Sequence, residues 1–231
     1  MESFSYLRKN LEAVNDTILR HGAGRDDKVT LVAVTKSASD EELLALAALG
    51  VCDMAENRPQ EVLRRKRLLD GAGYDVRMHE IGHLQTNKVK SILPVTAMIH
   101  SLSSLPLAEE IERRAAVLGI RMPVLIEINS AKEESKSGID PEDALRFYEA
   151  VRGFSHLSLC GVMTMGPYSE DPEASRPYFR ITKKIFDTIG EQYGYDTDSP
   201  VLSMGMSDSY GVAVEEGSTL VRVGRRLFVH R

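Results

Sequence analysis

Short apolar runs alternate with helical segments along almost the whole chain, and this alternation restricts the fold more than any other feature of the sequence. Apolar, β-branched runs predict strands near residues 29–34, 51–55, 76–81, 96–100, 122–128, 157–163, 199–203 and 219–223. Amphipathic stretches between most of them predict helices near 39–48, 58–69, 84–92, 104–118, 141–151 and 173–192. Strands and helices in this order are typical of a (β/α)8 TIM barrel. An open doubly wound sheet is the alternative, but no Gly-x-Gly-x-x-Gly follows the first strand.

A further helix is expected before the first strand. Residues 2–20 place four apolar side chains on one helical face: Leu7, Leu11, Val14 and Ile18.

Ser39 and Glu42 have the spacing of a capping box, and Pro141 is expected at the first position of a later helix. With 231 residues, 42% of them hydrophobic, the chain is expected to form one barrel domain over residues 1–231.

Charge and composition exclude several classes of protein. The net charge is −5, and the basic run at residues 64–67 lies in a helical pattern, so a nucleic-acid partner is not expected. The N-terminal residues lack the apolar core of a signal peptide, and no apolar run approaches the ~20 residues that span a membrane. Cys52 and Cys160 lie in apolar stretches and are expected to be reduced, buried thiols. These features predict a cytoplasmic protein without a membrane partner.

Lys36 ends the first predicted strand, in the run Val-Thr-Leu-Val-Ala-Val-Thr-Lys over residues 29–36. In a barrel, the carboxyl ends of the strands form the ligand-binding face. Burial there is expected to disfavour the charge of the lysine, lower its pKa and make the amine a nucleophile for aldehydes. Lys36 is therefore a candidate Schiff-base lysine, although a strand-end lysine that reaches solvent is the commoner case.

Arg222 lies in the middle of the last predicted strand, within the apolar run at residues 219–224. The first and eighth strands are neighbours in a closed barrel, and strand side chains alternate between faces. Arg222 and Lys36 are therefore expected to point into the same mouth. A buried ion pair with Glu127 or Glu80 is the alternative for Arg222, because a buried guanidinium needs a partner.

Serine and glycine residues follow the seventh strand and flank the eighth. Residues 202–208 read Leu-Ser-Met-Gly-Met-Ser-Asp, Gly217-Ser218 precedes the last strand, and Gly224 ends it. Backbone N–H groups in such loops bind anions, and barrel enzymes frequently hold phosphate after strands seven and eight, although these residues also form ordinary turns. A lysine for an aldehyde, an arginine for a ring nitrogen and a loop for a phosphate together suit pyridoxal 5′-phosphate (PLP).

Motifs along most of the chain resemble those of the pyridoxal phosphate homeostasis protein family, also called the YggS/PROSC family. The most specific are Ile-Gly-His-Leu-Gln-x-Asn-Lys at residues 81–88 and Ser-Met-Gly-Met-Ser-Asp at residues 203–208. Other matching segments occur in the same order: 33–36, 55–57, 60–61, 79–80, 100–101, 133–138, 161–165 and 217–224. The resemblance implies a barrel like the N-terminal domain of alanine racemases.

The resemblance also implies a role for each residue of the mouth. Lys36 would hold PLP as an internal aldimine, and Arg222 would lie near the pyridine nitrogen. Phosphate contacts are implied for Ser203, Gly205, Ser207 and Gly224. Residues implied to line or adjoin the mouth are Asn57, His83 and Met163.

The sequence departs from the family pattern at two places. Arg58-Pro59 follows Glu-Asn where the family usually has a tyrosine or a similar residue, and Arg225 stands where a small hydroxyl residue is usual. The hydroxyl would have donated to the phosphate. Arg225 or Arg226 would replace it by a charge-assisted contact or would point to solvent.

A non-catalytic role is expected from the same residues. An arginine cannot accept a proton from the pyridine nitrogen, so carbanion stabilisation by the ring should be weak. Alanine racemases with this arginine use a lysine and a tyrosine as bases, and the resemblance places that tyrosine in a second domain, which is not expected after the last strand. The alternatives are a PLP-dependent amino-acid racemase, a cofactor-free Schiff-base aldolase and a pure interaction module.

The expected function is to bind PLP reversibly and to buffer or deliver it. Recipients would be PLP-dependent apo-enzymes, and the protein would be a monomer. Lys136, in the loop Glu-Glu-Ser-Lys-Ser-Gly, is either an exposed loop lysine or a transient second site for PLP. The histidines are expected at strand ends and in loops, without a role as metal ligands.

Overall fold

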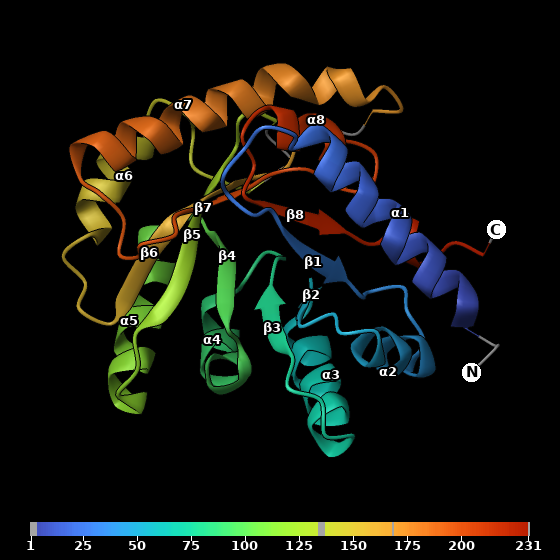
Figure 1. Cartoon of the computed structure of the whole chain (residues 1–231). Coiled ribbons are helices and arrows are strands. Elements are labelled where there is room, and N and C mark those ends of the chain that lie inside the picture. Colours follow the sequence, from blue (N-terminus) through green and yellow to red (C-terminus); the bar gives the residue numbers. More distant parts are fainter. Residues whose placement is uncertain (1–3, 134–136, 168, 231) are drawn as a thin grey trace.

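The computed structural model is a closed barrel of eight parallel strands that pair in sequence order (Figure 1). It describes residues 4–133, 137–167 and 169–230. The strands are β1 (Thr30–Val34), β2 (Asp53–Glu56), β3 (Arg77–Glu80), β4 (Met98–Leu102), β5 (Met122–Ile128), β6 (Leu157–Thr164), β7 (Val201–Ser203) and β8 (Leu220–Val223). The closed order excludes the open doubly wound sheet and confirms the (β/α)8 prediction.

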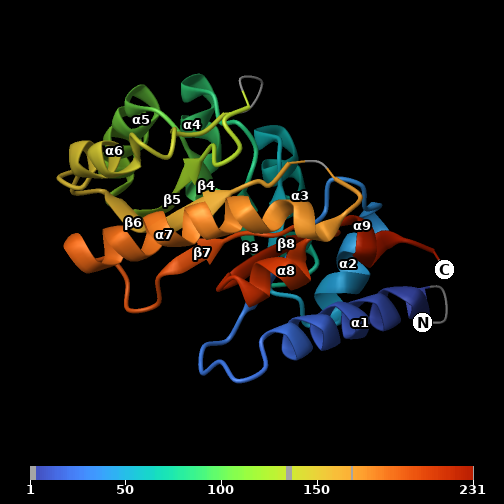
Figure 2. The ribbon, with the colours of Figure 1, turned by 90° about the horizontal axis from the view of Figure 1, so that it is seen from above.

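Helices surround the barrel (Figures 1 and 2). They are α1 (Ser5–His21), α2 (Asp40–Ala48), α3 (Pro59–Gly71), α4 (Thr86–Ile92), α5 (Leu105–Leu118), α6 (Ala144–Val151), α7 (Arg176–Gln192), α8 (Tyr210–Glu215) and α9 (Arg225–Phe228), with short 3-10 turns at Leu93–Val95 and Pro172–Ser175. Among the described residues, no helix is both long and apolar enough to cross a membrane.

Strand residues alternate between the lumen and the surrounding helices. On β1, Val32 and Val34 belong to a small lumen cluster with Ala55 and Leu220, whereas Ala33 packs with residues of the outer layer. β1 and β8 pair in parallel, with Val32 opposite Arg222. The predicted neighbourhood of the first and last strands is therefore confirmed.

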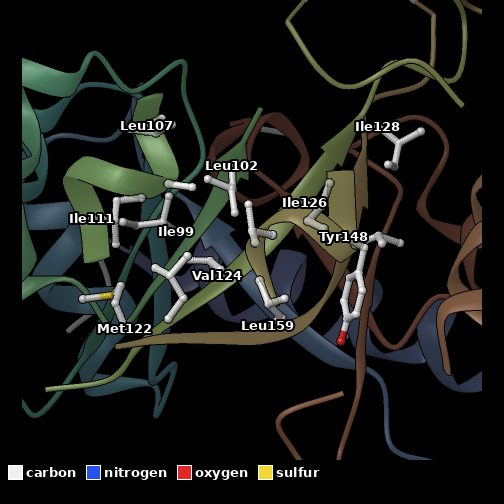
Figure 3. Packing of buried hydrophobic residues seen from close by; sticks show 14 of the residues in the cluster. Ile99, Leu102, Leu107, Ile111, Met122, Val124, Ile126, Ile128, Tyr148 and Leu159 are labelled. Atoms are coloured by element: carbon white, nitrogen blue, oxygen red, sulfur yellow. The ribbon is translucent and has the colours of Figure 1, made fainter. Parts of the chain in front are cut away.

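A large apolar layer fills the space between β4–β6 and the helices outside them (Figure 3). Ile99, Val124 and Ile126 are fully buried in this layer, together with Leu107 and Ile111 of α5. Burying a side chain of this size stabilises a protein by about 1.5–3 kcal/mol. The same alternation that buries these residues outside the sheet leaves the intervening side chains to fill the lumen.

The predicted N-terminal helix is present as α1 and has a clear structural role. The helix α9 that follows β8 is short, and α1 packs against α2, α8 and α9 on the outside of this part of the barrel (Figure 2). Leu7, Val14 and Ile18 are buried in that contact, while Leu11 is half-buried. The Asn10 side chain donates hydrogen bonds to the carbonyls of Leu227 (3.0 Å) and Val229 (2.9 Å), which ties α1 to the end of the chain.

The local predictions for the capping box, Pro141 and the two cysteines have different outcomes in the structure. The capping box is present, because Ser39 Oγ accepts from Glu42 N and Glu42 Oε2 accepts from Ser39 N. Pro141 does not begin a helix: it lies in a turn, and α6 starts at Ala144. Cys160 is buried as expected, but Cys52 is exposed, because it lies before β2 at the open amino end of the barrel.

Candidate functional site

Lys36 lies at the carboxyl end of β1, two residues beyond the strand. Its side chain is exposed, so the expectation of a buried, desolvated amine is wrong. The preceding residue fixes the backbone here: Thr35 N donates to the carbonyl of Ala55 (3.0 Å), and Thr35 Oγ1 donates to Glu56 Oε1 (2.6 Å). The amine is therefore presented to solvent from a well-held segment at the mouth of the barrel.

Arg222 is buried in the lumen, next to β1. Its Nη1 donates to Ser203 Oγ at 2.5 Å and its Nη2 to the carbonyl of Thr164 at 2.9 Å. Within the described part of the chain, it forms no ion pair with Glu127 or Glu80, so the alternative of a structural ion pair is wrong. Burial lowers the pKa of the Arg222 guanidinium to about 10, and the charge of Glu127 opposes that shift.

Glu127 projects from β5 and is also buried. Ser137 Oγ is 3.1 Å from each of its carboxylate oxygens, which connects the β5 strand to the loop after it. Burial raises the pKa of Glu127, while the hydrogen bond from Ser137 and the charge of Arg222 oppose the rise. Glu127 and Arg222 thus influence each other electrostatically without a direct contact.

The segment from Ser203, the last residue of β7, to Ser207 leads into the loop between β7 and α8. Gly205 has φ +88, and a Cβ at this position would lie 2.5 Å from Ala213 Cβ, so only glycine fits without strain. The carbonyl of Gly205 accepts from Arg222 N (3.0 Å), and Ser207 Oγ accepts from Gly224 N (3.2 Å). Over the described residues, the backbone N–H groups of Gly205 and Ser207 have no protein acceptor. These donors give the loop the chemistry of an anion site.

Arg225 and Arg226 both contact the same loop. Arg225 pairs with Asp208, and Arg226 Nε donates to the carbonyl of Ser207 at 2.6 Å. Both side chains are exposed. The two arginines therefore hold the β7–α8 loop against the start of α9, and Arg225 already has an anionic partner.

Asn57 and His83 lie on neighbouring loops at the carboxyl ends of β2 and β3, and both are exposed. Gly82 packs so closely on Asn57 that a Cβ there would lie 2.1 Å from the Asn57 carbonyl oxygen. Gly82 N donates to Glu80 Oε1 (2.8 Å), and burial raises the pKa of Glu80 to about 8. The buried Glu80 carboxyl therefore holds the loop that carries His83 against the loop that carries Asn57.

Met163 is fully buried on β6, in a lumen cluster with Leu125 and Cys160. It lies opposite Glu127 on β5 and Ser203 on β7, so it separates these polar side chains within the lumen. Lys136, the other lysine considered from the sequence, lies outside the described residues. No group of three His, Cys, Asp or Glu residues with metal-site geometry occurs in the described ranges.

Sequence reasoning missed a row of polar residues inside the lumen. Asp53, His79 and His100 face inward from β2, β3 and β4 and connect to Ser203 and Arg222 through hydrogen bonds. A polar residue in the middle of a short apolar strand, as at His100, is the signal that points to such a role. The cross-strand partners themselves depend on register, which the sequence pattern does not supply.

The chain matches a family model described as "Alanine racemase, N-terminal domain" over residues 5–231. It is 38% identical over 231 residues to the pyridoxal phosphate homeostasis protein of Aquifex aeolicus, which covers 100% of this chain and 99% of that protein. The protein of the same name from Helicobacter pylori (strain ATCC 700392 / 26695) is 37% identical over 211 residues, with 90% and 91% covered.

Solved structures give the same picture of the fold. PipY of Synechococcus elongatus, solved with PLP bound, superposes with a TM-score of 0.83 at 26% identity and covers 96% of this chain and 100% of that chain. An alanine racemase of Clostridium difficile 630 superposes with a TM-score of 0.76 at 18% identity, covering 97% of this chain and 59% of that chain. The likeness to the racemase concerns the fold alone.

Proposed function

The chain belongs to the pyridoxal phosphate homeostasis protein family, and on that premise we propose that it binds PLP reversibly through Lys36 and buffers or delivers the cofactor. The single observation that carries this proposal is the convergence of three groups at one end of the barrel. Lys36 is exposed beside the mouth, Arg222 lies on the adjoining strand, and Gly205 and Ser207 direct unpaired N–H groups from the next loop. An amine, a guanidinium and an anion site match the aldehyde, ring nitrogen and phosphate of PLP.

The residues around the loop suit the phosphate of the cofactor. Gly205 and Gly224 keep the phosphate loop free of side chains, since a Cβ at Gly224 would lie 2.9 Å from the Val34 carbonyl oxygen. Ser207 supplies a hydroxyl group on the same loop, and Ser203 supplies one at the end of β7. Asn57, His83 and Met163 are proposed as further contacts, and Arg225 as a phosphate contact that would have to leave Asp208 or share it.

Covalent binding needs little from the protein. The Lys36 amine, once neutral, attacks the aldehyde carbon, a C=N bond forms and the carbonyl oxygen leaves as water; addition of water reverses the step. An exposed amine suits such exchange, because both PLP and water reach it from solvent. PLP-dependent apo-enzymes are the proposed recipients, and the protein is proposed to act as a cytoplasmic monomer.

A non-catalytic role is proposed for the same reason that Arg222 suits binding. Bound PLP supplies electron-sink chemistry most effectively when its ring nitrogen is protonated, and Arg222 can only donate there. The guanidinium is held by Ser203 and Thr164, and toward a bound ring nitrogen it would offer a hydrogen bond and no proton acceptor. Racemase activity is the competing function, and the test below includes it.

The test is an absorbance spectrum of the purified protein after PLP addition. We expect a near-visible band that borohydride shifts irreversibly, and that is absent from Lys36→Ala. Lys184→Ala, which removes an exposed lysine from α7, should keep the band. No racemisation of alanine is expected. A band that survives in Lys36→Ala contradicts the assignment of the lysine, and Lys36-dependent racemisation overturns the non-catalytic role.

A further inference from the structure

A continuous row of hydrogen bonds crosses the barrel lumen from its amino end to Arg222. His79 Nε2 is 3.1 Å from Asp53 Oδ1, and His79 Nδ1 is 2.9 Å from His100 Nε2. His100 Nδ1 is 3.2 Å from Ser203 Oγ, which accepts from Arg222 Nη1 at 2.5 Å. The row therefore joins β2, β3, β4, β7 and β8 through side chains alone.

The row is shielded from solvent along its length. The exposed fractions are 8% for Asp53, 5% for His79, 0% for His100, 0% for Ser203 and 3% for Arg222. Burial, assisted by the charge of Arg222, holds the pKa of His100 well below its usual range, so His100 is neutral. A neutral imidazole has one donor and one acceptor nitrogen. Each neutral histidine therefore donates a hydrogen bond to one neighbour in the row and accepts one from the other, which gives the hydrogen bonds a direction.

Asp53 determines that direction. Burial opposes its charge, but hydrogen bonds from His79 and from Arg77 lower the pKa of Asp53 to about 2, so the carboxylate is ionised. Arg77 donates from Nε at 2.6 Å and from Nη2 at 2.5 Å. An ionised carboxylate only accepts, so His79 must carry its proton on Nε2.

The remaining protons follow from this assignment. In the neutral form of His79 its Nδ1 is an acceptor, so His100 carries its proton on Nε2 and donates to His79. His100 Nδ1 is left to accept the hydroxyl proton of Ser203. Ser203 Oγ then presents its lone pairs to Arg222, which can only donate. In this direction every donor and acceptor of the row has a partner. With the hydrogen bonds reversed, a lone pair of His79 would face the Asp53 carboxylate.

We propose that Asp53, through His79 and His100, positions the Arg222 guanidinium from the opposite end of the barrel. His79, His100 and Asp53 are positioning residues, because only Arg222 is placed to meet the bound ring. The inference rests on the proposed function insofar as Arg222 faces PLP. It goes beyond that function by assigning a role to three lumen residues that do not reach the mouth.

The direction of the row is measurable without any ligand. Long-range ¹⁵N–¹H NMR of the histidine rings, assigned with His79→Gln and His100→Gln, identifies the protonated nitrogen of each. We expect neutral Nε2–H tautomers for both in the wild-type protein. Nδ1–H at either ring, or a doubly protonated His79, overturns the proposed direction. This measurement does not depend on PLP binding, so it tests the direction of the hydrogen bonds in the row even if the proposed function fails.

Asp53→Asn tests whether the row positions Arg222. Arg77 requires an acceptor, so the new amide should turn its oxygen to Arg77 and its NH2 group to His79, which reverses the row. We expect Nδ1–H tautomers, a several-fold weaker affinity for PLP and a displaced absorbance maximum of the bound cofactor. The control is Ser101→Ala, which removes a buried hydroxyl without a hydrogen-bond partner from the strand of His100.

The outcomes of this experiment separate the two proposals. Reversed tautomers with unchanged PLP affinity and spectrum would leave PLP binding intact and overturn the positioning role. Unchanged tautomers in Asp53→Asn would show that Asp53 does not set the direction, which also overturns it. Equal effects in Ser101→Ala would assign the change to a general loss of packing around β4 and would count against the row.

Discussion

Two sets of buried polar groups lie on the same strands of the barrel but on opposite faces. Inside the lumen, Asp53, His79 and His100 each have hydrogen-bond partners. On the outer face, Glu56 and Glu80 end β2 and β3, and each has a carboxyl oxygen, Oε2, without a hydrogen-bond partner. The first set is a connected row, and the second consists of carboxyl groups that are only partly satisfied.

The difference shifts the pKa values of the carboxyls in the two sets in opposite directions. Burial raises the pKa of Glu56 and raises that of Glu80 to about 8, because their hydrogen bonds from Thr35 and Gly82 compensate only part of the lost solvation. Asp53, also buried, stays ionised because Arg77 and His79 both donate to it. Among these three carboxyls the pKa is therefore lowered only at Asp53, where two donors converge.

The largest expected effect comes from breaking the lumen row at its centre. His100→Leu leaves His79 Nδ1 without its donor and the Ser203 hydroxyl proton without its acceptor, and each orphaned buried group costs about 1–3 kcal/mol. We expect the free energy of unfolding, measured in urea, to fall by roughly 2–6 kcal/mol. Met98→Leu on the same strand is the volume-conserving control and should cost less than about 1.5 kcal/mol. Equal stabilities of the two variants would mean that the row contributes little.

A somewhat smaller effect, confined to high pH, is expected from Glu80→Gln. The folded-state pKa of about 8 lies above the usual 4.5, so the folded state binds a proton more tightly than the unfolded chain does. Stability should therefore decline as pH rises from about 4.5 to 8, by up to a few kcal/mol. Glu80→Gln should flatten this decline and be the more stable protein above pH 8.

Urea unfolding between pH 4 and pH 9 measures this decline, at about one-unit intervals. Glu109→Gln, an exposed site on α5, serves as the control and should leave the profile unchanged. If Glu80→Gln keeps the wild-type slope, ionisation of the outer carboxyl does not limit stability.

The smallest expected effect comes from Asp53, whose contribution to stability is lost at low pH, whereas that of Glu80 is lost at high pH. The pKa of Asp53 is about 2 in the folded protein and 3.8 without these contacts, so its contribution to stability is present above pH 3.8 and is lost as pH falls through 2. Asp53→Asn should cost on the order of 2 kcal/mol at neutral pH and much less near pH 2. Acid titration of both proteins by circular dichroism checks this, and a constant difference over the whole range would contradict it.

The architecture was predictable because it depends on local patterns. The short apolar, β-branched runs predicted all eight strands within a few residues, and the spacing of Leu7, Val14 and Ile18 predicted α1. The short helices α8 and α9 were not predicted, since six and four residues carry too little periodicity. Pro141 failed as a helix start because a turn precedes α6.

The candidate site was predictable to the level of strands and loops. Barrel closure places Lys36 and Arg222 on neighbouring strands whatever the loop details, and this was correct. The exposure of Lys36 was not, because the residue lies past the end of β1 and outside the packed lumen. Which residues bind PLP stays a prediction.

The sequence by itself determined the number and order of the strands, the helix that precedes them and the chemical groups at the carboxyl ends. Those properties follow from the periodicity of each segment and from the closure that eight parallel strands impose. Only the tertiary structure decided that Asp53, His79 and His100 form a row that ends on Arg222. Such partners depend on cross-strand register, and the register shifts between β4 and β5 and between β5 and β6. A shift of one residue turns a side chain to the other face, so no local pattern specifies it.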